Sequence, residues 1–144
     1  MLKVIFFGNH DVGIKCLETL IDITDIKGVI AHPVDPEEGI RYKSLYEFSS
    51  KKNLNVVRGK AKDQEILNFC LNIQPDLIWV TDYRFILPQS LINIPPLGAI
   101  NIHPSLLPKY RGRASLNWAL INGEKEVGLT GHYIDEGADT GNII

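Results

Sequence analysis

The chain contains 144 residues, of which 44% are hydrophobic and 22% are charged, and its formal net charge is −2 at pH 7. This length and composition are typical of one globular domain with a buried core. The charge argues against nucleic-acid binding by the surface as a whole, although it leaves room for a local basic patch. Cys16 and Cys70 lie far apart and have no histidine at metal-ligand spacing, which argues against a metal site or a redox pair and favours a reduced, cytoplasmic protein.

The first part of the chain alternates apolar runs with amphipathic segments. Residues 1–8 are apolar but too short to span a membrane, and the polar NHD that follows is not a small-residue cleavage site. We therefore predict a buried strand there and no membrane association. Residues 11–23 place apolar side chains at helical spacing, at Ile14, Leu17, Leu20 and Ile21. The apolar run at 26–32 then completes a predicted β–α–β unit.

The alternation continues to residue 80. After a polar loop at 33–41, the patterns predict a helix at 44–53, a strand at 55–59, a helix at 63–73 and a strand at 76–80. Apolar strands joined by helices predict a mostly parallel, doubly wound α/β sheet with right-handed crossovers, whose ligands bind beyond the carboxyl ends of the strands. The final TGNII begins an apolar run with no following element, so we expect a natural chain truncated at its C-terminus.

The strand-like segment AINIHPSLLPKYRG, residues 99–112, carries two polar side chains on one face. Asn101 and His103 are two residues apart, so they point the same way, while Ile100 and Ile102 point to the opposite face. Such a pair can also do no more than satisfy backbone groups at the end of a strand. The pair alone therefore does not decide between a structural and a chemical role.

The segments that follow make the pattern specific. SLLPKYRG occupies residues 105–112, and DTG occupies residues 139–141. Together with Asn101 and His103, these motifs resemble those of the 10-formyltetrahydrofolate-dependent formyltransferases, most specifically over residues 98–144. The resemblance implies that residues 1–144 form the family's N-terminal catalytic domain, with a Rossmann-like fold. It also implies 10-formyltetrahydrofolate as cosubstrate and a catalytic triad of Asn101, His103 and Asp139.

Elementary chemistry agrees with this triad. Formyl transfer to an amine needs donors for the charge that develops on the formyl oxygen and a route for the amine proton. Asn101 can supply an amide donor, and His103 can act either as a charged donor or, when neutral, as a base. Asp139 would favour the charged form of His103, although the alternative is a simple turn residue in EGADTG. We expect His132 to be structural or supporting rather than catalytic.

The resemblance places the pterin between the loop after the fourth strand and the loop before Asp139. Apolar walls with backbone donors suit a flat heteroaromatic ring, although Ile86 and Leu87 equally suit ordinary packing. The residues assigned to this cosubstrate are Phe85, Ile86, Leu87, Pro88, Asp135, Glu136, Gly137 and Ala138.

The acceptor site is predicted from three segments, HDVG, DYRFILP and YRGRASLNW, which resemble the sugar-nucleotide branch of the family. The first loop lacks G-x-G-x-x-G, which disfavours an NAD enzyme, and Asp11 in it could instead cap the next helix. Arginine suits a diphosphate because it bonds two oxygens at once, although solvated loop charges are the alternative. The candidate acceptor-binding residues are Asn9, His10, Asp11, Tyr83, Arg84, Ser105, Lys109, Arg111 and Arg113. Trp79 and Trp118 are expected in the core.

The sequence therefore predicts transfer of a formyl group to a primary amine, with the amino group of a nucleotide-linked sugar as the expected acceptor. Three alternatives stay open. They are a methionyl-tRNA formyltransferase, a formyltetrahydrofolate hydrolase that uses water as acceptor, and a nucleotide-binding module without catalysis. The sequence specifies neither the sugar, nor the base, nor the oligomeric state.

Overall fold

The protein is described by a computed structural model that covers residues 1–39 and 42–144. The predicted loop at 33–41 includes residues 40 and 41, which lie outside the described residues. The elements, in chain order, are β1 (Lys3–Gly8), α1 (His10–Ile23), β2 (Asp25–Ala31), α2 (Leu45–Lys51), β3 (Val56–Arg58), α3 (Gln64–Ile73), β4 (Leu77–Thr81), α4 (Gln89–Ile92), β5 (Ala99–His103), α5 (Ser115–Ile121) and β6 (Thr130–Tyr133).

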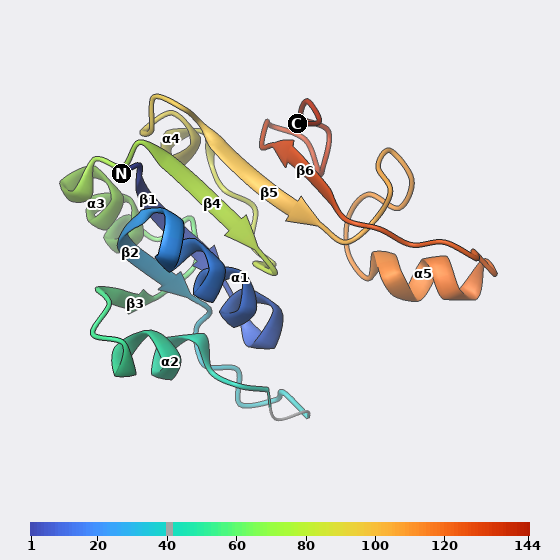
Figure 1. Ribbon diagram of the computed structural model, residues 1–144, viewed down its shortest axis with the longest axis horizontal. Helices are drawn as coiled ribbons and strands as arrows, with labels where there is room; N and C mark the ends of the chain where they lie inside the picture. Colours follow the sequence, from blue (N-terminus) through green and yellow to red (C-terminus); the bar gives the residue numbers. More distant parts are fainter. Residues whose placement is uncertain (40–41) are drawn as a thin grey trace.

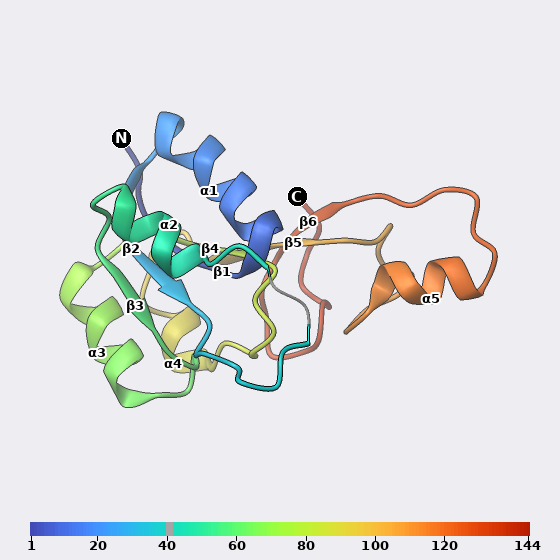
Figure 2. The ribbon, with the colours of Figure 1, turned by 90° about the horizontal axis from the view of Figure 1, so that it is seen from below.

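The strands form a six-stranded sheet with the order β3-β2-β1-β4-β5-β6. Neighbouring strands from β3 to β5 are parallel, and β6 is antiparallel to β5. Helices α1 and α2 cover one face of the sheet, and α3 and α4 cover the other (Figure 2). The predicted fold class, a mostly parallel and doubly wound α/β sheet, is confirmed.

The core explains why the central strands are apolar on both faces. Ile5 and Phe7 of β1 pack into one cluster with α3 and α4, whereas Phe6 between them packs into a second cluster with α1 and α2. All three side chains are fully buried because alternate residues of a strand point to opposite faces, and each face is covered by helices. This arrangement leaves the loops at the carboxyl ends of the strands as the open edge of the sheet.

Helix α5 differs from the other helices because it projects away from the sheet (Figure 1). It buries only Ser115 and Ala119, and Trp118 on it is 55% exposed. The prediction that Trp118 lies in the core is therefore wrong, because apolar spacing does not reveal whether a helix meets the sheet. Trp79 is half-buried against the core, as predicted, and its Nε1–H donates to Thr81 Oγ1 at 3.0 Å.

In the described part of the chain, no helix combines the length and the apolar character needed to cross a membrane.

Candidate active site

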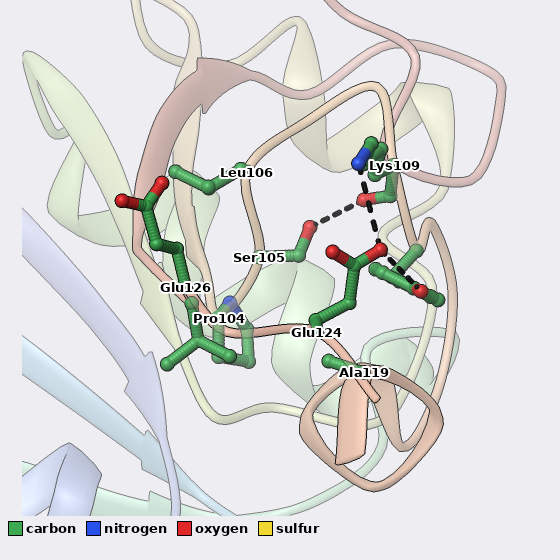
Figure 3. Close-up of a pocket in the computed structure, with 9 residues that line it drawn as sticks. Pro104, Ser105, Leu106, Lys109, Ala119, Glu124 and Glu126 are labelled. Carbon is green, nitrogen blue, oxygen red and sulfur yellow. Dashed lines mark hydrogen bonds and ion pairs between the residues drawn. The ribbon is translucent and has the colours of Figure 1, made fainter. Parts of the chain in front are cut away.

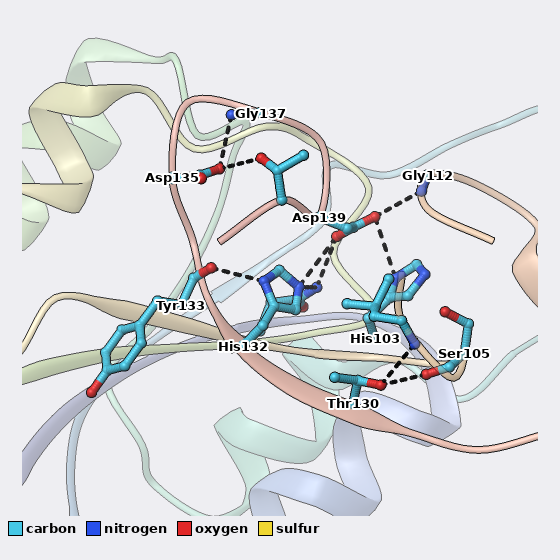
Figure 4. A network of polar contacts seen from close by, with 12 residues as sticks. His103, Ser105, Gly112, Thr130, His132, Tyr133, Asp135, Gly137 and Asp139 are labelled. Atoms are coloured by element: carbon cyan, nitrogen blue, oxygen red, sulfur yellow. Dashed lines mark hydrogen bonds and ion pairs between the residues drawn. The ribbon is translucent and has the colours of Figure 1, made fainter. Parts of the chain in front are cut away.

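The three residues of the predicted triad come together at the carboxyl end of β5. Asn101 and His103 lie two residues apart, on the same face of the strand. The loop after β6 brings Asp139 to His103 (Figure 4) and to Asn101. His103 Nδ1 lies 3.4 Å from Asp139 Oδ2, and Asn101 Nδ2 lies 3.5 Å from Asp139 Oδ1. The cluster is sheltered from solvent, since the side chain of His103 is 6% exposed and that of Asp139 is 16% exposed.

Asp139 is fixed in place by backbone geometry. Its φ of 55° lies in the left-handed region, which Asp tolerates better than most residues. The Gly112 N–H donates to Asp139 Oδ2 at 2.8 Å. After Asp139 the chain passes so close to the Tyr133 carbonyl that Gly141 has no room for a Cβ atom. The carboxylate therefore accepts from a loop N–H while it faces the Asn101 amide and the His103 ring of β5.

The loop before Asp139 contains the residues predicted to contact the pterin from that side. The Asp135 carboxylate accepts hydrogen bonds from Thr140 Oγ1 at 2.6 Å and from the Gly137 N–H at 3.0 Å. These two bonds hold the pKa of Asp135 below its usual range. Asp135 thus shapes this loop, while Glu136 and Ala138 are exposed at its tip.

Each ring nitrogen of His103 faces a hydrogen-bond acceptor of the protein. Nε2 lies 2.8 Å from the Tyr110 carbonyl oxygen, and Nδ1 faces the Asp139 carboxylate. Because both partners only accept, the arrangement suits the doubly protonated imidazolium, which donates to both. The loop at 104–112 therefore contacts two members of the cluster, His103 through Tyr110 and Asp139 through Gly112.

Ser105 and Lys109, which were predicted to bind the acceptor, hold the 104–112 loop (Figure 3). Ser105 is buried, and its hydroxyl donates to the Lys109 carbonyl at 2.7 Å. Lys109 Nζ lies 3.4 Å from Glu124 Oε1, which also accepts from the Tyr110 hydroxyl at 2.8 Å. A small cavity of about 90 Å³ lies beside these residues.

The two arginines predicted to grip the acceptor, Arg111 and Arg113, are exposed on the same segment.

A larger cavity, of about 290 Å³, opens at the ends of β1 and β2 and contains part of the predicted acceptor site. The His10 ring stacks on Tyr42 with centroids 4.0 Å apart, and its Nε2 lies 2.7 Å from Glu38 Oε1. Arg84 pairs with Asp35 at 3.3 Å on the same wall. Of the predicted acceptor residues, the cavity is lined by Asn9, His10 and Arg84.

Asp11 and Tyr83 serve other contacts. The predicted alternative of a helix cap by Asp11 is wrong, because Asn9 occupies the N-cap position of α1 and Asp11 lies inside the first turn. The exposed Asp11 carboxylate instead accepts from the Lys43 N–H at 3.4 Å. The Tyr83 hydroxyl donates to the Gly59 carbonyl at 2.8 Å, and its burial raises the pKa of that hydroxyl. Tyr83 thus packs against His32, which lines the cavity, with ring centroids 4.9 Å apart.

His32 is buried at the end of β2, and desolvation, assisted by Arg84, lowers its pKa to about 4. Its Nε2 accepts from the Arg84 N–H at 3.1 Å, as a neutral imidazole should.

The residues predicted to contact the pterin after β4 divide into buried and exposed ones. Leu87 is 4% exposed and belongs to the core, so the alternative of ordinary packing describes it. Pro88 is the N-cap residue of α4. Phe85 is half-buried against His32, whereas Ile86 is 75% exposed. Phe85, Ile86 and Pro88 therefore keep apolar surface that a ligand can reach here.

His132 joins the cluster more closely than its predicted supporting role required. It lies opposite Asn101 in the antiparallel pairing of β5 and β6, and it is 2% exposed. Its Nε2 is 3.3 Å from Asn101 Nδ2 and 3.4 Å from Asp139 Oδ1. The signal that could have found it is strand pairing: a polar residue in a second strand at the register of Asn101.

Comparisons with known proteins concern the family and the fold of the chain. The family model described as formyl transferase matches residues 18–144. A methionyl-tRNA formyltransferase from Clostridioides difficile is 40% identical over 148 residues, covering 99% of this chain and 48% of the relative. Another, from Acetivibrio thermocellus, is 38% identical with the same coverage. The chain thus spans about half the length of the curated relatives it matches.

Solved structures show the same fold. A phosphoribosylglycinamide formyltransferase from Streptococcus pneumoniae superposes with a TM-score of 0.81 at 20% identity, covering 100% of this chain and 79% of the other. A sugar 3N-formyl transferase, solved in the presence of dTDP and 5-N-formyl-THF, superposes with a TM-score of 0.72 at 25% identity, covering 100% and 50%. With the match over residues 18–144, these findings show that the chain belongs to the formyl transferase family.

Proposed function

We propose that the protein transfers the formyl group of 10-formyltetrahydrofolate to a primary amine at the cluster of Asn101, His103 and Asp139. The observation that carries this proposal is that an amide and an imidazole each lie within 3.5 Å of the same carboxylate, in a sheltered site at the carboxyl edge of the sheet. Family membership supports the same reaction class.

The residues around the cluster fit the formyl donor. Phe85 in the loop after β4 and Ile134 at the start of the loop before Asp139 pack against the same core cluster. Exposed Ile86 offers an apolar surface, and the exposed tip at 136–138 offers backbone groups, which together suit a flat heteroaromatic ring. When bound, 10-formyltetrahydrofolate supplies the activated formyl group. The chain's own residues then orient this group and stabilise the charge that appears on it.

The roles of the three side chains follow from their chemistry. Attack by a neutral amine places negative charge on the formyl oxygen, where the His103 imidazolium and the Asn101 amide are suitable donors. Since the Tyr110 carbonyl occupies His103 Nε2, donation to the formyl oxygen exchanges that hydrogen bond for a new one. The attacking amine becomes positively charged, and the Asp139 carboxylate is the neighbouring base that can accept its proton. The bond between the formyl carbon and the folate nitrogen then breaks, and that nitrogen takes up the proton and leaves as tetrahydrofolate.

For the acceptor we propose the amino group of methionyl-tRNA, because the curated relatives at 38–40% identity carry that name. The second candidate is the amino group of a sugar nucleotide. It is favoured by the cavity of about 290 Å³ at the carboxyl ends of β1 and β2. This cavity is lined by the stacked His10 and Tyr42 rings and by Arg58 and Arg84. Aromatic rings and arginines are suited to a base and to phosphates.

The test measures tetrahydrofolate release from 10-formyltetrahydrofolate with methionyl-tRNA, with UDP-4-amino-4-deoxy-L-arabinose, or with neither. Release that requires methionyl-tRNA supports the first acceptor, and release that requires the amino sugar supports the second. Release with water alone identifies a hydrolase, and none with any acceptor contradicts the enzymatic proposal. Asn101→Ala and His103→Ala should abolish release. Asn72→Ala, a matched change at an exposed position of helix α3, should not.

A further inference from the structure

His132 carries contacts that the proposed reaction does not yet use. Its ring lies between two members of the cluster, with Nε2 3.3 Å from Asn101 Nδ2 and 3.4 Å from Asp139 Oδ1. The other ring nitrogen, Nδ1, lies 2.8 Å from the Tyr133 carbonyl oxygen. The side chain is buried, so these protein groups, rather than bulk water, decide which nitrogen carries a proton.

The hydrogen-bond partners of the His132 ring determine which nitrogen carries the hydrogen when the ring is neutral. The Tyr133 carbonyl only accepts, so Nδ1 must carry a hydrogen. Nε2 of the neutral ring is then a bare acceptor, and it receives one hydrogen from Asn101 Nδ2. The second hydrogen of the same amide is directed toward Asp139 Oδ1, 3.5 Å away. In this state both amide hydrogens of Asn101 are held by the protein, and the amide offers the formyl oxygen no donor.

A proton on His132 Nε2 reverses this arrangement. Nε2–H then donates, and the amide of Asn101 meets it favourably only after turning its Oδ1 toward the ring. The turn releases Asn101 Nδ2 to donate to the formyl oxygen. We propose that His132 is a positioning residue whose Nε2 proton selects the end of the Asn101 amide that faces the formyl group. This inference rests on the proposed function.

The charged and titratable groups around His132 come from two parts of the chain, the loop after β6 and strand β5. Asp139 faces Nε2 from the loop after β6, and Asp135 lies in the same loop. His103 faces it from β5, with ring centroids 6.4 Å apart. The two carboxylates attract a proton on His132, and a charged His103 opposes it. The state of the ring therefore depends on the same charges that the reaction changes.

The first test is spectroscopic and needs no turnover. In ¹⁵N-labelled protein, long-range ¹H–¹⁵N spectra should show a neutral His132 with the hydrogen on Nδ1, and a scalar coupling should connect Asn101 Nδ2 to His132 Nε2. On acidification both ring nitrogens should carry hydrogen, and that coupling should disappear. A neutral ring with its hydrogen on Nε2, or an Asn101 amide that does not respond when His132 titrates, would overturn the proposal.

The second test compares two variants in turnover with the acceptor identified above. His132→Leu lacks the Nε2–H that turns the Asn101 amide, so Nδ2 stays directed toward Asp139 Oδ1. It should therefore lower kcat about 100-fold, as expected for loss of one oxyanion donor, with the KM for 10-formyltetrahydrofolate unchanged. His132→Gln keeps a polar amide near the position of Nε2 and should recover at least half of this loss on a logarithmic scale. Wild-type kcat in the leucine variant would overturn the proposal, as would equal kcat losses in two folded variants.

Failure of the proposed function and failure of the proposal for His132 can be distinguished. If the wild-type protein turns over with none of the acceptors, the proposed function fails, while the spectra still decide how His132 and Asn101 share their hydrogens.

Discussion

Replacing Asp139 by asparagine removes one charge from the cluster and keeps its shape. The new side chain can still accept from the Gly112 N–H, which now lies 2.8 Å from the carboxylate. It can no longer attract the His103 imidazolium, whose Nδ1 is 3.4 Å from Oδ2. At an effective dielectric constant of about 20, two opposite charges at 3.4 Å attract each other by about 5 kcal/mol. Desolvation of the two sheltered groups cancels part of this attraction.

Because only part of this attraction bears on the transition state, we expect kcat of Asp139→Asn to fall about 100- to 1000-fold, equivalent to about 3–4 kcal/mol. The assay is tetrahydrofolate release at saturating 10-formyltetrahydrofolate and acceptor, with thermal melting to verify folding. Asp22→Asn, on the exposed surface of α1, is the charge-matched control and should keep wild-type turnover. A folded Asp139→Asn protein that turns over within about threefold of wild type would refute the charge argument.

Three further predictions concern stability. Burial lowers the pKa of His32 to about 4 from an ordinary 6.5. As the pH falls, His32 therefore takes up a proton in the unfolded chain before it does so in the folded chain. The free energy of unfolding should then fall by up to about 3 kcal/mol between pH 6.5 and 4, and His32→Gln should flatten that decline in urea titrations. Within the described chain, Ser49 Oγ is buried without a hydrogen-bond partner, so Ser49→Ala should raise the urea midpoint by the equivalent of about 1 kcal/mol. Tyr83→Phe should cost about 1 kcal/mol of stability through the lost bond to Gly59 and leave the acceptor's KM unchanged, whereas a raised KM would restore Tyr83 to the acceptor site.

The sequence predicted the sheet well because its signals are local. Apolar runs and helical spacing depend on neighbouring residues, and the period of two along a strand was enough to place Asn101 and His103 on one face. The meeting with Asp139 could not be derived from spacing. It depends on a loop that returns against the Tyr133 carbonyl, and only the resemblance to a family pointed to it.

The contributions of the other candidate residues depend on partners that are distant in the chain. Tyr83 bonds to Gly59, 24 residues away, and His132 meets Asn101, 31 residues away. Neither contact can be predicted from the spacing of residues near Tyr83 or His132 in the sequence. Trp118 shows the converse, since its apolar neighbours give α5 the composition of a buried helix, yet no part of the sheet covers it.

The pairing of β6 with β5 has a consequence for how the chain can vary in length. Because the pairing register holds His132 against Asn101, the connection at 104–129 can gain or lose residues at its exposed parts without moving the histidine. The interval from His132 to Asp139 has no such freedom, since its length must let the carboxylate reach both the strand and the Gly112 N–H. An insertion there would separate the acid from both imidazoles while leaving every strand of the sheet intact.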